Sequence, residues 1–192
     1  WPFGWDGRGP QRDALMARLT AYMRKAAKEA KEETSWVQPD EGYDAALTSF
    51  VQGVMHDDLM MGDMGRFSDR LGTYAATNAI AQVLLKLTVS GIPDTYQGCE
   101  LWNQSLVDPD NRRAVDFQTA GRMLADITQR LQRLDDRQAL VSDLLKTWTT
   151  GAIKLFVTHL ALAAVAGVLA ISVIASIANP KKRPRHSQRS RR

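Results

Sequence analysis

Residues 92–117 have no helical periodicity, although the sequence on both sides of them repeats its apolar residues every three or four positions. Pro93, Gly98 and Pro109 interrupt regular structure within this stretch. A long irregular connection inside a compact chain is usually either functional or disordered. Disorder requires few aromatic and apolar residues, and this stretch contains too many of both. We therefore predict an ordered polar loop that binds a ligand, set between helices.

The side chains of this stretch combine carboxylates, guanidinium groups, amides and aromatic rings. Proteins bind sugars with this set, because carboxylates and amides form hydrogen bonds to neighbouring hydroxyl groups and aromatic faces cover the apolar face of a pyranose ring. Paired carboxylates can also perform acid/base chemistry on a glycosidic bond. The candidate contacts are Asp94, Tyr96, Gln97, Glu100, Trp102, Asp108, Asp110, Asn111, Arg112 and Arg113.

A structural role is an equally good interpretation of the same side chains. In that interpretation Arg112 or Arg113 pairs with Asp108 or Asp110 and holds the shape of the loop. The run DPDN is also ordinary turn sequence. On the residues alone, both interpretations stay open.

Charge is distributed unevenly along the chain. Seven of the 25 lysines and arginines follow Pro180, whereas all 21 acidic residues precede it. The part before Pro180 therefore carries 18 basic against 21 acidic residues, a net charge of −3, which is not the pattern of a nucleic-acid-binding protein. The single cysteine, Cys99, excludes an internal disulfide and suits a reducing compartment.

The sequence lacks the motifs of metal, cofactor and nucleophile sites. It has no glycine-rich phosphate loop, no nucleophile elbow, no HExxH and no paired CxxC, and its three histidines are scattered. His56, Asp57 and Asp58 have no evident further ligands, so we interpret them as a solvated helix end rather than a metal site. We predict neither a cofactor nor a metal.

Periodic apolar residues predict helices over 11–33, from 39 to about 54, over 67–88, and again after 117. The run RKAAKEAKEE in the first helix is interpreted as a solvated face. The glycines of MMGDMG predict a turn before the third helix, and the apolar stretch 79–87 predicts that this helix is largely buried. Residues 92–96 are a candidate strand, and AIKLFVTHL is either a strand or the start of a helix.

Residues 160–178 carry no charge and are just long enough to cross a bilayer as a helix, and the basic run KKRPR follows them. Three interpretations compete: a membrane span, an artefactual tail that follows a change of reading frame near Ala164, and an apolar helix packed in the protein. The chain opens with Trp1 rather than Met and shows no secretory signal, which indicates a fragment or a processed product.

The central stretch resembles the late signature of maltooligosyl trehalose synthases, which are members of the alpha-amylase superfamily (glycoside hydrolase family 13). The resemblance rests on YQGCELWNQSLVDPDNRRAVDF, with TAYMRKAAKEAKEETSW and NAIAQVLLKLTVSGIPD before it and LLKTWTTGAIKLFVTHLAL after it. It covers residues 1–164 and stops there abruptly. Ser90, Asn103 and Ala114 depart from the usual residues of the signature.

The resemblance implies a chain that is mainly α and forms the late part of an α/β amylase-type (β/α)8 barrel with a helical insertion, followed by an apolar C-terminal helix. The implied domains are a helical insertion with late barrel helices (1–91), the eighth barrel strand with the loop on the active-site side (92–117), helices after the barrel (118–159), an apolar segment that is transmembrane or frame-shifted (160–179), and a basic disordered tail (180–192). Loops that follow barrel strands open onto the active-site face. Sugar contact is therefore expected first of Asp94, Tyr96, Gln97, Glu100 and Trp102, and a structural role is favoured for the other five candidates.

The resemblance also implies an activity, the conversion of maltooligosaccharide to maltooligosyl trehalose by intramolecular transglucosylation, an isomerase reaction of trehalose biosynthesis. The family takes its catalytic carboxylates from earlier strands, so we expect no catalytic residue here and an inactive chain on its own. The implied partner is a maltooligosaccharide (an α-1,4-glucan), without nucleic acid and with a membrane only through 160–178. The implied location is the cytoplasm. The alternative is a membrane-anchored carbohydrate-binding protein or a degenerate, non-catalytic scaffold.

Overall fold

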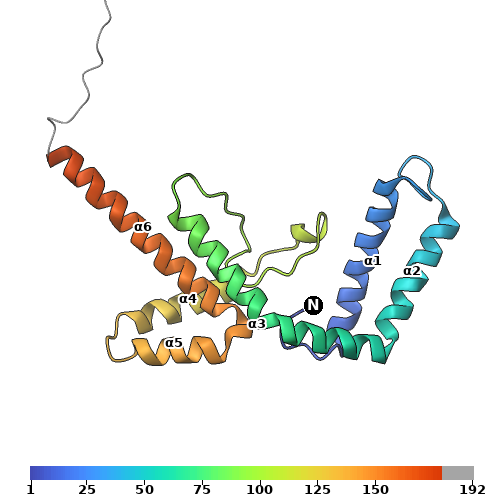
Figure 1. Cartoon of the computed structure of the whole chain (residues 1–192), viewed down its shortest axis with the longest axis horizontal. Coiled ribbons are helices and arrows are strands. Elements are labelled where there is room, and N and C mark those ends of the chain that lie inside the picture. Colours follow the sequence, from blue (N-terminus) through green and yellow to red (C-terminus); the bar gives the residue numbers. More distant parts are fainter. Residues whose placement is uncertain (179–192) are drawn as a thin grey trace, which may run out of the picture.

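The computed structural model of the chain describes residues 1–178, and they are mainly α-helical (Figure 1). The helices are α1 (Pro10–Ala30), α2 (Glu41–His56), α3 (Asp58–Thr88), α4 (Phe117–Leu131), α5 (Arg137–Lys146) and α6 (Ala152–Ala178), with the short 3-10 helices η1 (Asp110–Arg112) and η2 (Trp148–Thr150). No strand occurs within this part of the chain. The prediction of a mainly helical chain is confirmed, and its place in a barrel stays a prediction.

Helix α3 joins two lobes (Figure 1). In the N-terminal lobe, α1 and α2 form a helical hairpin that packs on the start of α3 together with residues 1–9. In the C-terminal lobe, α6 contacts α4, α5 and the end of α3. The loop of residues 89–116 connects α3 to α4 and contacts both lobes. It is therefore placed to be shaped by both of them.

Each lobe has its own hydrophobic core. The N-terminal core is formed by Trp5, Val51, Met55 and Met61, with partly buried Trp1, Leu15, Met16, Leu19 and Met23 around them. The C-terminal core is formed by Ile127, Leu140, Leu144 and Leu155, with Leu101 of the loop among the side chains packed against it. Full burial of one such side chain is worth ~1.5–3 kcal/mol. Because the two cores share no residue, each core stabilises its own lobe.

Helix α3 begins at Asp58, so the predicted turn at MMGDMG is wrong. Asp57 caps the helix directly after α2, because its Oδ1 accepts hydrogen bonds from the backbone N–H of Leu59 and of the next residue at 2.9 and 3.1 Å. The glycines of this run lie inside the helix. A Cβ atom on Gly65 would lie 3.5 Å from the ring of Trp1, which is an ordinary van der Waals contact, so packing does not require glycine there. A sequence pattern does not separate a glycine that ends a helix from one that lies within it.

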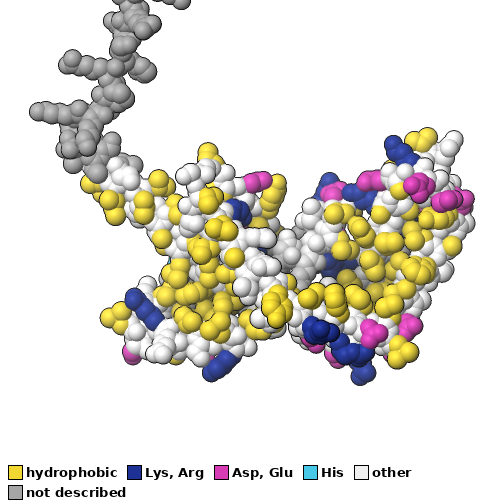
Figure 2. Space-filling model, viewed as in Figure 1, with side chains coloured by type: hydrophobic (Ala, Val, Ile, Leu, Met, Phe, Trp, Pro, Cys, Tyr) yellow, Lys and Arg dark blue, Asp and Glu magenta, His cyan; other side chains and the backbone are white. Residues whose placement is uncertain are grey.

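Apart from Leu87, the residues of the apolar stretch 79–87 of α3 are exposed or half-buried, which contradicts the predicted burial. Leu84 and Leu85 are 45% and 60% exposed, and Leu87 is the one buried residue of the stretch. The described residues cover this end of α3 chiefly with α6, so the rest of the helix surface stays open. Figure 2 shows hydrophobic side chains lying open over both lobes on one face of the molecule.

Residues 92–96 form no strand, contrary to the prediction. A strand is stabilised by hydrogen bonds to a neighbouring strand, and residues 1–178 contain none. Ile92 is fully exposed as a result. Assignment of this segment to the eighth strand of a barrel stays a prediction.

The run AIKLFVTHL is the start of α6, which settles the choice between strand and helix. Leu155 and Ala161 are buried in the C-terminal lobe, whereas Leu169 and Ile171 are 61% and 69% exposed. The helix thus packs at its beginning and is open further along, where the sequence loses its resemblance to the synthases.

A membrane span is compatible with α6 by length and composition alone. Residues Ala152–Ser172 are long and apolar enough to cross a bilayer, although buried helices of soluble proteins pass the same test. No membrane role is shown by this finding. The predicted basic tail 180–192, with the last residue of the predicted apolar segment 160–179, lies outside the described residues.

Candidate functional site

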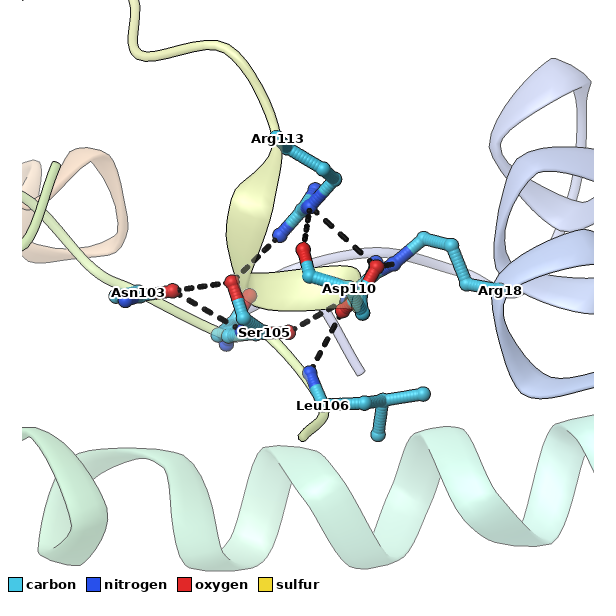
Figure 3. A network of polar contacts seen from close by, with 7 residues as sticks. Arg18, Asn103, Ser105, Leu106, Asp110 and Arg113 are labelled. Atoms are coloured by element: carbon cyan, nitrogen blue, oxygen red, sulfur yellow. Dashed lines mark hydrogen bonds and ion pairs between the residues drawn. The ribbon is translucent and has the colours of Figure 1, made fainter. Parts of the chain in front are cut away.

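Asp110 is the centre of a polar network that fixes the loop against α1 (Figure 3). Arg18 of α1 donates from Nε and Nη2 to the two carboxylate oxygens of Asp110 at 2.7 and 2.8 Å, and its Nη2 also donates to the carbonyl of Gln104 at 2.8 Å. The backbone N–H of Leu106 donates to Asp110 Oδ2 at 2.7 Å. The Asp110 side chain is only 8% exposed, so this bidentate ion pair is largely shielded from water.

The pKa of Asp110 follows from this network. The hydrogen bonds from Arg18 lower the pKa of the Asp110 carboxyl to about 2, against the opposing effect of burial, and the N–H of Leu106 lowers it further. The carboxylate is therefore ionised throughout the physiological range, which is the form that pairs with Arg18.

Arg113 extends the network back to the start of the loop. Its Nε donates to the carbonyl of Asp110 at 3.1 Å, and its Nη2 donates to Ser105 Oγ at 2.9 Å. Ser105 in turn donates from Oγ and from its backbone N–H to Asn103 Oδ1, at 2.6 and 3.1 Å (Figure 3). Residues 103–113 are thus closed into a ring of side-chain and backbone contacts.

Asp108 is held in a second ion-pair group. Its side chain pairs with Arg112, and Lys25 of α1 lies 3.6 Å from Asp108 Oδ2 and donates to its carbonyl at 2.6 Å. Arg113 lies 3.4 Å from Asp110 Oδ1. The pairing of these arginines with Asp108 and Asp110, one of the two interpretations that the sequence left open, is therefore present in the structure.

Trp102 is packed into an aromatic cluster. Its Nε1 donates to the carbonyl of Trp148 at 2.7 Å. Its ring meets the rings of Phe3 and Trp148 at centroid separations of 5.6 and 6.5 Å, in edge-to-face geometry. Gly72 of α3 makes room for the cluster, because a Cβ there would lie 3.1 Å from the Trp148 ring. Only part of the Trp102 ring is left for a ligand.

Lys154 of α6 holds the same end of the loop. Its Nζ donates to the carbonyl of Leu101 at 2.9 Å and lies 5.9 Å from the centre of the Trp102 ring. The side chain is buried, and this burial lowers the pKa of Lys154, with Lys86 acting in the same direction.

The remaining candidates near the start of the loop are more open. Tyr96 is 71% exposed, and the nearby Asp94 carboxylate raises the pKa of the phenol. Gln97 is exposed and Glu100 is half-buried. These side chains can reach a ligand without breaking any contact that holds the loop.

A pocket of about 230 Å³ brings together five of the ten candidates, namely Gln97, Glu100, Trp102, Asn111 and Arg113. Asn103, Gln104, Ser105 and Asp116 add further polar groups to its wall. The volume is below the ~300–1,000 Å³ of sites for drug-sized ligands, which suits one small ring. Asp94, Tyr96, Asp108, Asp110 and Arg112 do not line this pocket.

The cations that fix the loop were not found from the sequence. Arg18 lies in the predicted helix 11–33 but outside its apolar stripe, and Lys25 belongs to the run RKAAKEAKEE. Lys154 lies 53 residues after its partner Leu101 in the chain. The interpretation of that run as a solvated face is wrong in part. Lys28 in the same run is buried and lies 3.0 Å from Asp44 Oδ2 of α2. The only sequence signal for these ion pairs is that arginine and lysine recur on one face of the first helix.

The described residues contain no group of three or more histidine, cysteine, aspartate or glutamate side chains that could hold a metal ion. Cys99 is a free thiol. The site offers amides, carboxylates, a hydroxyl, a guanidinium and part of an aromatic ring, a set that forms hydrogen bonds with a polyhydroxylated ligand.

No protein-family model matches the chain. Its helices and loop nevertheless reproduce a section of solved enzymes that are much longer, and those enzymes are synthases. One is the maltooligosyltrehalose synthase from Arthrobacter ramosus, at 37% identity and a TM-score of 0.64, covering 77% of this chain and 18% of that one. Another is a maltooligosyl trehalose synthase at 26% identity and a TM-score of 0.69, covering 85% of this chain and 21% of that one.

A curated protein of Mycobacterium tuberculosis named as a maltooligosyl trehalose synthase is 41% identical over 115 residues. This match takes in 60% of the chain, which spans about 15% of the length of that relative. In sequence and in fold, the chain is thus similar to a section of maltooligosyl trehalose synthases, as its motifs predicted.

Proposed function

We propose that the chain forms part of a maltooligosyl trehalose synthase and that its loop lines a sugar subsite of that enzyme. The observation that carries this proposal is the joint match in sequence and fold, 41% identity to a named relative and a TM-score of 0.64 to a solved synthase at 37% identity. Because the chain spans about 15% of the relative, the activity of the whole enzyme belongs to the proposal.

The proposed reaction converts maltooligosaccharide to maltooligosyl trehalose by intramolecular transglucosylation. An acid catalyst for this chemistry must keep a proton near neutral pH, which requires a raised pKa. Asp110 has the opposite property, since its pKa is lowered to about 2 and its side chain is covered by Arg18. Asp110 is therefore not the acid catalyst, and we assign the catalytic carboxylates to another part of the enzyme, with no activity from this chain alone.

The proposed subsite is the pocket at the start of the loop. Gln97, Glu100 and Asn111 supply hydrogen-bond donors and acceptors to it, and the part of Trp102 that is not packed supplies an apolar edge. Asp94 and Tyr96 lie outside its wall and are exposed, so we assign them contacts with a neighbouring part of a bound glucan. Asp108, Asp110, Arg112 and Arg113 act mainly by holding the backbone of the loop.

Isothermal titration of the whole chain with maltopentaose tests the proposal. We expect binding by the wild-type chain and weaker binding, by about fivefold, in Asn111→Ala, because that substitution removes one amide from the pocket wall and a neutral hydrogen bond is worth ~0.5–1.5 kcal/mol. Asn78→Ala, an exposed asparagine of α3 outside the pocket, is the matched control.

Two results would contradict the proposal. Absence of maltopentaose binding by a folded wild-type chain removes the assigned subsite. Release of products with trehalose ends by the chain alone would contradict the assignment of the catalytic carboxylates to another part of the enzyme. A cytoplasmic location follows from the proposed enzyme, and fractionation that finds the chain with membranes would point to α6 as an anchor instead.

A further inference from the structure

A second cleft of about 580 Å³ lies between α1 and the loop, away from the pocket described above. One wall is a single face of α1, formed by Ala21, Arg24, Lys25, Lys28 and Glu29, which recur at three- and four-residue spacing. Asp108 and Pro109 of the loop form the opposite wall, and Trp36 closes one end. The loop network therefore shapes this cleft as well as the first pocket.

Trp36 is held in place although its ring is 63% exposed. It lies in a tight turn in which the backbone N–H of Ser35 donates to the carbonyl of Gln38 at 3.0 Å and the N–H of Gln38 donates to Ser35 Oγ at 2.8 Å. The ammonium group of Lys28 lies 5.2 Å from the centre of the indole. An exposed indole ring on an ordered turn is a preformed apolar platform, because little entropy is lost when a ligand covers it.

The cations that line the cleft are all paired with carboxylates. Lys28 pairs with the buried Asp44 at 3.0 Å, and Arg24 lies 3.6 Å from the same oxygen. Lys25 pairs with Asp108 at 3.6 Å and with Glu29 at 3.9 Å. Each of the three cations that line the cleft thus already has a carboxylate partner, so the cleft does not call for an anion such as a phosphate. Its exposed polar groups and its aromatic end instead fit a neutral ligand with many hydroxyl groups.

We propose that this cleft is a second glucan-binding site, with Trp36 stacking on a glucose ring and with Glu29 and Arg24 bonding its hydroxyl groups. This inference rests on the proposed function, because the glucan class of ligand comes from it. Asp108 belongs to the second site and Asn111 to the first, so the short segment 108–111 lies between two stretches of one bound chain or two bound chains.

Isothermal titration of the whole chain with maltopentaose tests the second site through Trp36. We expect Trp36→Ala to raise the dissociation constant at least about fivefold, and Trp36→Phe to raise it less, because a smaller flat ring remains. Glu29→Ala, at an exposed position of the wall, is expected to weaken binding about threefold. Phe50→Ala removes a ring that is 64% exposed on α2 outside the cleft, and it should leave the affinity unchanged.

The outcomes separate this inference from the proposed function. If the wild-type chain binds maltopentaose and both Trp36→Ala and Glu29→Ala bind it equally well, the second site is refuted and the first pocket remains. If the wild-type chain does not bind maltopentaose, both proposals are overturned. Equal binding of cellopentaose, whose glucose units are β-linked, would overturn the assignment to α-glucans.

Discussion

The two ends of the loop are fixed by different physics. Residues 99–102 are held by packing of Trp102 against the rings of Phe3 and Trp148 and by one ammonium group of the C-terminal lobe, that of Lys154. Residues 104–113 are held on the N-terminal lobe by ion pairs, above all Arg18 with Asp110. The first attachment depends on buried apolar surface, and the second depends on ionised groups. One loop therefore carries a part that acid should release and a part that acid should leave in place.

The largest expected effect comes from removing the cation at the ionic end. Arg18→Ala removes the main partner of the Asp110 carboxylate together with the hydrogen bond to the Gln104 carbonyl, so we expect the free energy of unfolding to fall by about 3 kcal/mol. Urea denaturation measures this. Arg66→Ala breaks an ion pair with Asp63 on the exposed surface of α3 and should cost less than about 1 kcal/mol. Equal losses in the two variants would show that the Arg18 pair contributes no more than a surface pair.

Acid is expected to weaken the ionic end by a smaller amount. The pKa of Asp110 is about 2 in the folded chain, below the value of 3.8 for a free aspartate carboxyl group. A lowered folded-state pKa gives stability that is present above pH 3.8 and is lost as the pH falls from there toward 2. We expect a loss of about 2 kcal/mol from this group.

The same acid titration compares the two ends directly. Urea denaturation at pH 5 and at pH 2.5 should show a smaller acid-induced loss in Arg18→Ala than in the wild-type chain, because the variant has already lost the interaction that lowers the Asp110 pKa. The aromatic contacts of Trp102 do not titrate in this range. An identical acid-induced loss in both proteins would assign acid sensitivity to other carboxylates.

The smallest of these effects is expected at the aromatic end. Trp102→Phe keeps a ring in the cluster but removes the N–H that donates to the Trp148 carbonyl at 2.7 Å, so we expect a loss of about 1 kcal/mol at any pH between 3 and 7. Tyr74→Phe, at a position 73% exposed, controls for loss of a polar group on a ring and should stay within about 0.5 kcal/mol. A loss in Trp102→Phe that grows in acid would show that the two ends of the loop are not independent.

The position of the loop could be predicted from the sequence, and much of its internal pairing could be proposed. Asp108 and Arg112 are four residues apart and Asp110 and Arg113 three apart, so a turn brings each pair together. The partners on α1 could not be predicted, because Arg18 and Asp110 are 92 residues apart in the chain. Nothing in the local pattern of a helix shows which of its exposed cations meets a distant loop.

The burial of α3 is a second feature that the local sequence pattern could not predict. Apolar residues over 79–87 predict a buried helix, since such a helix normally has neighbours all round it. In the described residues α3 has neighbours along part of its surface only, and Leu85 is 60% exposed. The apolar pattern of a helix shows which of its residues are suited to burial. The elements that pack around the helix determine which of these residues are buried.

The sequence by itself determined the helical class of the chain, the place of the irregular loop and the resemblance to maltooligosyl trehalose synthases, because helix periodicity, turn residues and a long ordered signature are local properties of a chain. The tertiary structure decided which loop residues are covered and which are open. Asp110 lies under Arg18, Trp102 is packed against Trp148, and Trp36, a residue with no place in the predicted site, is held open beside α1. These outcomes depend on contacts between residues far apart in sequence, which no local pattern encodes.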